Sequence, residues 1–164
     1  KLGLTKRDRN LHISRIVEMA TYRNMMKNLC NDWSESKYSI ILDSEVSFNT
    51  DTFDILLQSL KLNKNVALST PFGIDKETLE YYDTYAFEDI NGSCNVVPVF
   101  EGNESQISVN SAFAGFVIIR SHILQVCNWG LVEVRCSEHT YFCEQVREFG
   151  QILCVRDAIV KWKR

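Results

Sequence analysis

The chain contains few residues that break regular structure. It has only two prolines and seven glycines among 164 residues, and 45% of its residues are hydrophobic. No long polar tract divides the sequence. A chain of this size and composition is typical of one globular domain with a sizeable core. We therefore expect residues 1–164 to form a single domain.

Long apolar runs are also absent. The longest, such as Phe113–Ile119, fall far short of the roughly 20 residues that a membrane-spanning helix needs. Residues 1–10 are charged and lack the apolar segment of a secretory signal. The sequence thus predicts no membrane segment in this chain.

Positive charge is not in excess. Lysine and arginine number 18 against 21 acidic residues, which gives a net charge of −3. No basic stripe with interleaved aromatic residues is present, and such a stripe is typical of nucleic-acid-binding surfaces. Nucleic acid is therefore not an expected partner.

The six cysteines are scattered rather than densely spaced. They lie in apolar surroundings, which favours reduced, buried thiols over a disulfide framework. Two glycosylation sequons, Asn91–Ser93 and Asn103–Ser105, matter only in a secretory lumen. The composition favours a cytoplasmic location and leaves the Golgi lumen open.

Helical and extended patterns alternate along most of the chain. Apolar spacings of three and four and capping residues predict helices at Ser14–Cys30, from Asp51 through Leu60, from Ser121 to near Trp129, and at Ser137–Phe149. Short apolar runs predict strands at Lys37–Asp43, Asn65–Ser69, Asn95–Phe100, Val109–Arg120 and Gln151–Val155. The polar segment Ile74–Ser108 is expected to be a long functional loop around its short strand. This alternation predicts an α/β fold with a mostly parallel central sheet flanked by helices.

The most informative pattern is Ile40–Glu45. An apolar run ends at Asp43, and a second acid, Glu45, follows two residues later. Two carboxylates just beyond a buried strand can bind a hard cation whose other ligands are diphosphate oxygens and water. A surface turn with two solvated acids gives the same short pattern. The motifs elsewhere in the chain must therefore decide between a metal site and such a turn.

Several motifs in order resemble the GT-A glycosyltransferases. Among these enzymes, the chain most resembles the fungal capsule-associated α-1,3-mannosyltransferase-like proteins and their viral and bacterial relatives. The motifs lie within Arg15–Asn24, Ile41–Val46, Tyr82–Tyr85, Asn110–Phe116 and Ser137–His139.

The resemblance implies a single-domain GT-A, Rossmann-like fold and a retaining hexosyltransferase activity. It implies Mn²⁺ or Mg²⁺ as cofactor, a UDP- or GDP-sugar as donor, and a glycan or protein-linked acceptor. The usual N-terminal nucleotide-binding strand is lacking or divergent in residues 1–164.

Site residues follow from the same resemblance. Asp43 and Glu45 align with the family's D-x-D and would bind the metal, with His139 near the metal or phosphates. Asp83 and Glu138 would be catalytic. The expected substrate-binding residues are Arg23, Asn24, Tyr82, Tyr85, Ser111 and Gly115.

Two other interpretations remain open. Cys127, Cys136, His139 and Cys143 offer four ligands for a zinc-binding structural module. Alternatively, the chain is a GT-A-like domain without catalytic activity, an interpretation that applies if the nucleotide-binding strand of the family is missing or is hidden in a divergent Lys1–Leu11.

Overall fold

The computed structural model describes residues 6–30, 35–130 and 137–162, with side chains from residue 13 onward. In chain order the helices and strands are α1 (Lys6–Leu29), β1 (Tyr38–Leu42), β2 (Val46–Phe48), α2 (Thr50–Leu62), β3 (Val66–Asp75), β4 (Gln106–Val109), β5 (Phe116–Arg120), α3 (Ser121–Val126), α4 (Glu138–Arg147) and β6 (Gln151–Trp162).

The strands form one mixed sheet of order β1-β5-β3-β6-β2, with β4 also paired to β6. Among the described strands, only β3 and β6 run parallel, and the other four pairings are antiparallel. The predicted mostly parallel, Rossmann-like sheet is therefore wrong. Strand–helix alternation predicts parallel strands because a crossover helix returns the chain in the same direction. Here a loop rather than a helix joins β3 to β4, so the chain can return antiparallel.

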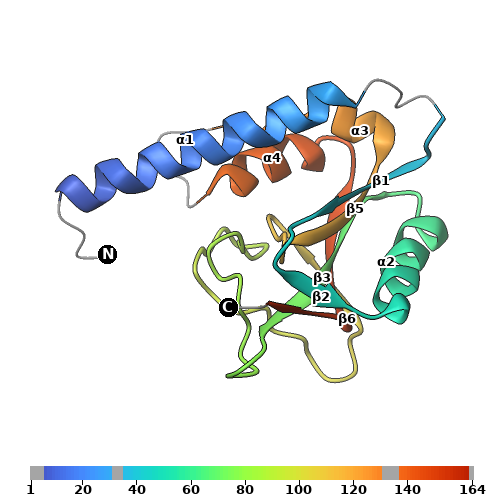
Figure 1. Cartoon of the computed structure of the whole chain (residues 1–164). Helices are drawn as coiled ribbons and strands as arrows, with labels where there is room; N and C mark the ends of the chain where they lie inside the picture. Colours follow the sequence, from blue (N-terminus) through green and yellow to red (C-terminus); the bar gives the residue numbers. More distant parts are fainter. Residues whose placement is uncertain (1–5, 31–34, 131–136, 163–164) are drawn as a thin grey trace.

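Helices cover both faces of the sheet. In Figure 1, α1 and α4 lie together on one side and α2 packs on the other. Alternate residues of β5 point to opposite faces of the sheet, as the twofold side-chain period of a strand requires. Val117 and Ile119 join the hydrophobic cluster that contains Phe142 of α4. Phe116 and Ile118 join the cluster that contains Leu56 of α2.

Local signals set the helix boundaries. The Asn49 side chain caps α2 by accepting a hydrogen bond from the Thr52 N–H at 2.9 Å, so Asn49 rather than the predicted Asp51 is the cap. Arg120 binds the Leu60 carbonyl at 2.9 Å and so satisfies a group at the other end of α2. Ser137 stands at the cap position of α4, as predicted, and its N–H donates to the Thr140 hydroxyl at 3.4 Å.

Several predicted strands have different bounds. β3 continues through Pro71 and Gly73 to Asp75, and β6 continues to Trp162. The predicted strand Val109–Arg120 is divided, because Phe113–Phe116 form a turn in which Ala114 and Gly115 have positive φ values of 50° and 70°. Asn95–Phe100 is not a strand.

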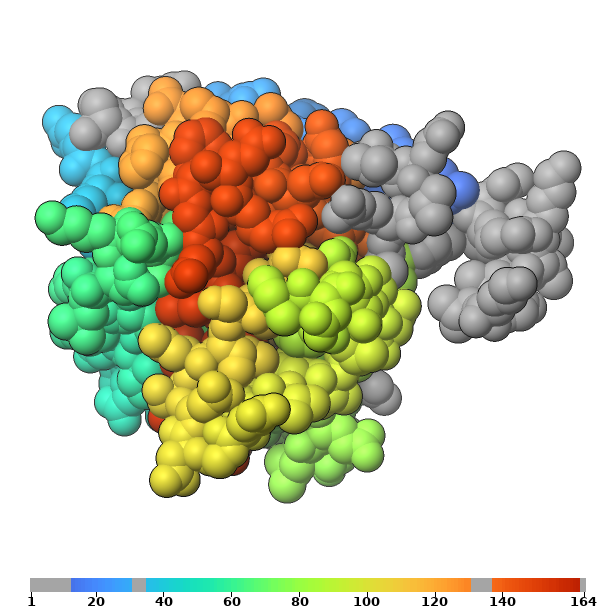
Figure 2. Space-filling model, turned by 180° about the vertical axis from the view of Figure 1, so that it is seen from behind, coloured from blue at the N-terminus to red at the C-terminus, as the bar shows by residue number. Residues whose placement is uncertain are grey.

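The loop between β3 and β4, residues 76–105, is long and mostly irregular, as predicted. Seen from behind in Figure 2, it covers the face below α4, in yellow-green to yellow. Five cysteines are free thiols in the described ranges, and three of them are buried, but Cys30 is exposed, contrary to the prediction. Cys136 lies outside the described residues. None of the helices described is long and apolar enough to cross a membrane.

Candidate functional site

A cavity of about 660 Å³ lies where α1, the start of α4, the turn after β1 and the end of β6 meet. Its volume is in the usual range of small-molecule sites. Fourteen described residues from five segments line it: Arg15, Ile16, Met19, Arg23, Asp43, Ser44, Glu45, Tyr82, Asp83, Tyr85, Ala86, Glu138, His139 and Trp162.

The predicted acid pair lies in this cavity. Asp43 follows β1 directly, and its N–H donates to the Gly115 carbonyl at 2.8 Å. A second bond, from the Val46 N–H to the Asp43 carbonyl at 3.3 Å, closes a turn that presents Glu45. β1 is an edge strand of the described sheet, so the acid pair lies at a sheet edge rather than at the centre.

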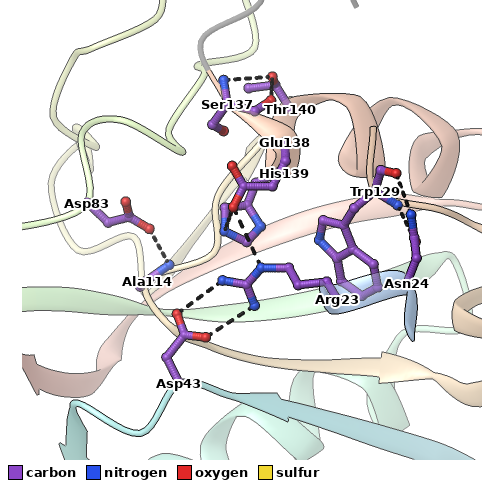
Figure 3. Close-up of polar contacts among 10 residues, drawn as sticks. All are labelled: Arg23, Asn24, Asp43, Asp83, Ala114, Trp129, Ser137, Glu138, His139 and Thr140. Atoms are coloured by element: carbon purple, nitrogen blue, oxygen red, sulfur yellow. Dashed lines mark hydrogen bonds and ion pairs between the residues drawn. The ribbon is translucent and has the colours of Figure 1, made fainter. Parts of the chain in front are cut away.

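Arg23 of α1 bridges two carboxylates at the cavity wall. Its guanidinium donates to both Asp43 oxygens, at 3.1 and 3.4 Å, and its Nε lies 3.6 Å from Glu138 Oε1. Figure 3 shows the guanidinium between the two acids. The three side chains are 12%, 27% and 9% exposed, respectively, so the network is shielded but reaches the cavity. A cation is already favoured at Asp43.

Glu138 and His139 begin α4 and point toward Arg23. His139 Nε2 lies 3.3 Å from Glu138 Oε1, and its ring stacks on Phe113 with centroids 3.9 Å apart. Burial, assisted by the nearby Arg23 charge, lowers the pKa of His139 well below its ordinary value. The imidazole is therefore neutral near pH 7, and its Nε2 lies beside the Glu138 carboxylate.

Asp83 is fixed by the Phe113–Phe116 turn, which leads into β5. One of its oxygens accepts a hydrogen bond from the Ala114 N–H at 2.9 Å. Burial, together with the charges of Asp43 and Glu138, raises the pKa of Asp83 to about 6, although backbone hydrogen bonds oppose the shift. A carboxyl group with this pKa exchanges its proton near neutral pH.

Aromatic rings complete the cavity. Tyr82 and Tyr85 line it, as the sugar-site prediction required, and Tyr82 stacks on Trp162 with ring centroids 4.5 Å apart. The cavity therefore combines carboxylates, guanidinium groups and flat apolar surfaces.

Three predicted substrate-binding residues have other roles. The Asn24 side chain binds both backbone groups of Trp129, at 2.7 and 3.0 Å, and holds α1 to the segment after α3. Ser111 is buried and donates to the Ala86 carbonyl at 2.7 Å. Gly115 lies beneath Trp162 rather than in the cavity lining. Sequence motifs cannot separate these packing roles from ligand contact.

The predicted metal ligands are only partly assembled. Asp43, Glu45 and His139 all line the cavity, but across the described ranges no three His, Cys, Asp or Glu side chains form a group that could hold a metal by themselves. For the zinc alternative, Cys127 and Cys143 are buried apolar core residues, and Cys136 lies outside the description. Any cation here needs further ligands from a substrate or water.

Six lining residues were not predicted as site residues: Arg15, Ile16, Met19, Ser44, Ala86 and Trp162. Arg15, Met19 and Arg23 recur every four residues, so the helical period of Ser14–Cys30 could have shown that they share one face. Trp162 could not be found in this way, because the predicted last strand ended at Val155.

No known protein family matches this chain, and no curated protein matches it. Among solved structures it is similar to the crystal structure of A197 from STIV, with 14% sequence identity and a TM-score of 0.49. The similarity covers 84% of this chain and 61% of that protein.

The predicted membership of the GT-A glycosyltransferases is wrong, since no family matches and the sheet is mixed. The motifs that suggested it are short combinations of acidic, aromatic and small residues. Such combinations recur by chance, and they also serve packing, as Asn24 and Ser111 do here.

Proposed function

We propose that this chain transfers a sugar from a nucleotide-diphosphate donor, with Mn²⁺ or Mg²⁺, to a hydroxyl group of a glycan or protein-linked acceptor. One observation carries the proposal. A single cavity gathers the acid pair Asp43 and Glu45 with a second pair, Asp83 and Glu138. The two pairs suit the two requirements of the reaction, which are neutralisation of the leaving diphosphate and proton transfer at the acceptor.

The residues present fit a divalent cation. Asp43 and Glu45 place two carboxylates at the cavity, and a divalent cation would compete there with the Arg23 guanidinium, which pairs with Asp43 at 3.1 Å. Asp43 and Glu45 would hold the metal, and phosphate oxygens and water would complete its coordination, as is usual for Mg²⁺. When bound, the metal neutralises the charge that develops on the diphosphate as the glycosidic bond breaks.

The α1 helix supplies positive charge beside this pair. Arg15 and Arg23 both line the cavity, and Arg15 is exposed there. A guanidinium can donate two parallel hydrogen bonds to a phosphate group. The two arginines therefore give the diphosphate a binding site that complements the metal.

Asp83 and Glu138 have environments suited to different tasks. With a pKa of about 6, Asp83 can accept the proton of an acceptor hydroxyl near neutral pH. Glu138 is fixed between Arg23 and His139, so its carboxylate is a rigid acceptor for sugar hydroxyl groups. The roles follow from burial and from neighbouring charge.

A donor panel tests the proposal. UDP-glucose, UDP-galactose, GDP-mannose and GDP-fucose would be incubated with Mn²⁺, and sugar release would be scored with and without glycan acceptors. We expect metal-dependent turnover of at least one donor by the wild type, and none by Asp43→Asn. The matched control is Asp54→Asn, which removes an exposed acid of α2 outside the cavity.

Metal-dependent binding without hydrolysis or transfer would identify a binding protein rather than a transferase. No binding of any donor, with metal present, would refute the proposed function.

A further inference from the structure

One wall of the cavity is a stacked pair of aromatic rings. The centroids of Tyr82 and Trp162 are 4.5 Å apart, and the ring planes are inclined by 27°. Tyr82 belongs to the loop after β3, and Trp162 is the last residue of β6. Both residues line the cavity, so the parts of the two rings that do not face each other border it.

The indole is held by the backbone around it. Trp162 pairs with Val46 of β2 on one side and with Asp75 of β3 on the other. Gly115 lies beneath the ring, and a Cβ atom added there would come within 2.5 Å of Trp162 Cζ2. No real Cβ fits at that distance, and the positive φ of 70° also favours glycine. Gly115 is therefore a positioning residue for the indole.

Each ring of the aromatic pair neighbours an acidic residue of the cavity, through the chain or through the sheet register. Trp162 is in register with Val46, which directly follows Glu45, and Tyr82 directly precedes Asp83. The turn under Trp162 also binds both acids through its backbone: the Gly115 carbonyl accepts from Asp43, and the Ala114 N–H donates to Asp83. The turn therefore holds the Asp83 carboxylate and the Asp43 backbone next to the indole.

Such a surface matches the chemistry of a sugar ring. A pyranose has an apolar face of C–H groups and a rim of hydroxyl groups. Large, flat aromatic side chains offer apolar contact area, and flanking carboxylates accept hydroxyl hydrogen bonds.

We propose that the donor's sugar ring lies on the Tyr82–Trp162 pair and that Trp162 is a specificity-determining residue for that sugar. This inference rests on the proposed function. The nucleotide base binds elsewhere in the cavity, so loss of the indole weakens recognition of the sugar and not of the nucleotide.

The test compares ligands with and without the sugar. Calorimetry with Mn²⁺ would give affinities for UDP-glucose and GDP-mannose and for UDP and GDP, in wild type, Trp162→Leu and Trp162→Phe. Trp162→Leu should lose roughly tenfold in affinity for the sugar nucleotide that the wild type binds, with unchanged affinity for its nucleoside diphosphate. Trp162→Phe keeps an aromatic ring, so its affinity for the sugar nucleotide should lie between those of the wild type and Trp162→Leu.

Phe48→Leu is the control. Phe48 lies on β2, packs against Phe116 with centroids 4.6 Å apart, and does not line the cavity. The Phe48→Leu variant should bind all four ligands with the affinities of the wild type. Thermal unfolding of each variant would show that the fold is kept.

The outcomes are distinguishable. Equal losses for sugar nucleotide and nucleoside diphosphate, or no loss for either, would overturn the assignment of the sugar to Trp162 while leaving the proposed function intact. If the wild type binds a nucleoside diphosphate but gains nothing from the attached sugar, the assignment also fails. If the wild type binds none of the four ligands, the proposed function itself fails.

Discussion

Two networks in this molecule place an arginine among polar side chains, and they differ in what surrounds them. In the cavity, Arg23 contacts Asp43 at 3.1 Å and Glu138 at 3.6 Å. In the second network, Arg147 of α4 donates to Asn110 Oδ1, and Asn110 Nδ2 donates to Glu88 Oε1 at 3.2 Å. The residue types are similar.

The second network belongs to the backbone framework. The Glu88 N–H donates to the Ser111 carbonyl at 2.9 Å, and the Glu88 carbonyl accepts from Asn110 and Ser111 at 3.0 and 3.1 Å. Neither Glu88, Asn110 nor Arg147 lines the cavity. The comparison teaches that access, not composition, separates a candidate site from a structural tie. Each prediction below tests this distinction.

The largest effect is expected at Asp43. Asp43→Asn keeps the shape and removes the charge, so sugar transfer or donor hydrolysis should fall by roughly 100-fold or more. The melting temperature should change little, because the side chain is 27% exposed at the cavity. Steady-state kinetics with Mn²⁺ and thermal unfolding check both parts. Full activity in this variant would show that the acid has no part in the reaction.

The opposite pattern is expected at Asn110. Asn110→Ala leaves Glu88 Oε1 and Arg147 without this amide partner, which should lower the free energy of unfolding by about 1–3 kcal/mol. Donor affinity of the folded protein should stay within about twofold of wild type, because the network is remote from the cavity. Urea unfolding and calorimetry give the two quantities. A selective loss of donor affinity would break the comparison.

Asp83 should make stability depend on pH. Its pKa of about 6 in the folded state exceeds the ordinary 3.8, so the folded state binds more protons between these values. This group's contribution to stability therefore falls as pH rises from about 4 to 6 and stays low above. Asp83→Asn should raise the free energy of unfolding by about 1–3 kcal/mol at pH 7.5 and by much less at pH 4.

Urea titrations at the two pH values measure that difference. The matched control is Asp54→Asn, which should change the free energy of unfolding only slightly, and by the same amount at pH 4 and pH 7.5. A gain for Asp83→Asn that is the same at pH 4 and pH 7.5 would contradict the assigned burial of the carboxyl group.

The smallest effect concerns Arg23. Because its guanidinium occupies Asp43, a metal must compete with it, and Arg23→Gln should increase affinity for Mn²⁺ without nucleotide by about threefold to tenfold. Arg147→Gln, in the structural network, should leave Mn²⁺ affinity unchanged. Titration calorimetry compares the two. If wild type and Arg23→Gln have equal affinities for Mn²⁺, then Arg23 and the metal do not compete for Asp43.

Local features of the fold could be predicted from the sequence. The apolar stripe with Leu56 and Leu60 predicts α2, and both residues are fully buried. Ser137 predicts the start of α4, and the apolar run before Asp43 predicts β1. These signals involve neighbours in the chain, and they placed Asp43 at a strand end beside the cavity.

The pairing of distant strands could not be predicted in this way. The direction of β5 between β1 and β3 depends on packing across the whole sheet, and apolar runs carry no sign of it. β6 continues to Trp162, but the charged residues Arg156 and Asp157 interrupt its apolar pattern, so the predicted strand ended at Val155. The turn at Ala114 and Gly115 was visible only as small residues, although it fixes Asp43, Asp83 and Trp162 together.

The most direct test of the cavity as a metal-assisted diphosphate site is the linkage between the two ligands. Mn²⁺ affinity would be measured by calorimetry with and without saturating UDP or GDP, in wild type and in Asp43→Asn. The account predicts that the nucleotide strengthens Mn²⁺ binding by roughly tenfold or more in the wild type, that Mn²⁺ strengthens nucleotide binding by the same factor, and that both effects vanish in the variant. Nucleotide binding that is indifferent to chelators and to Asp43→Asn would contradict it.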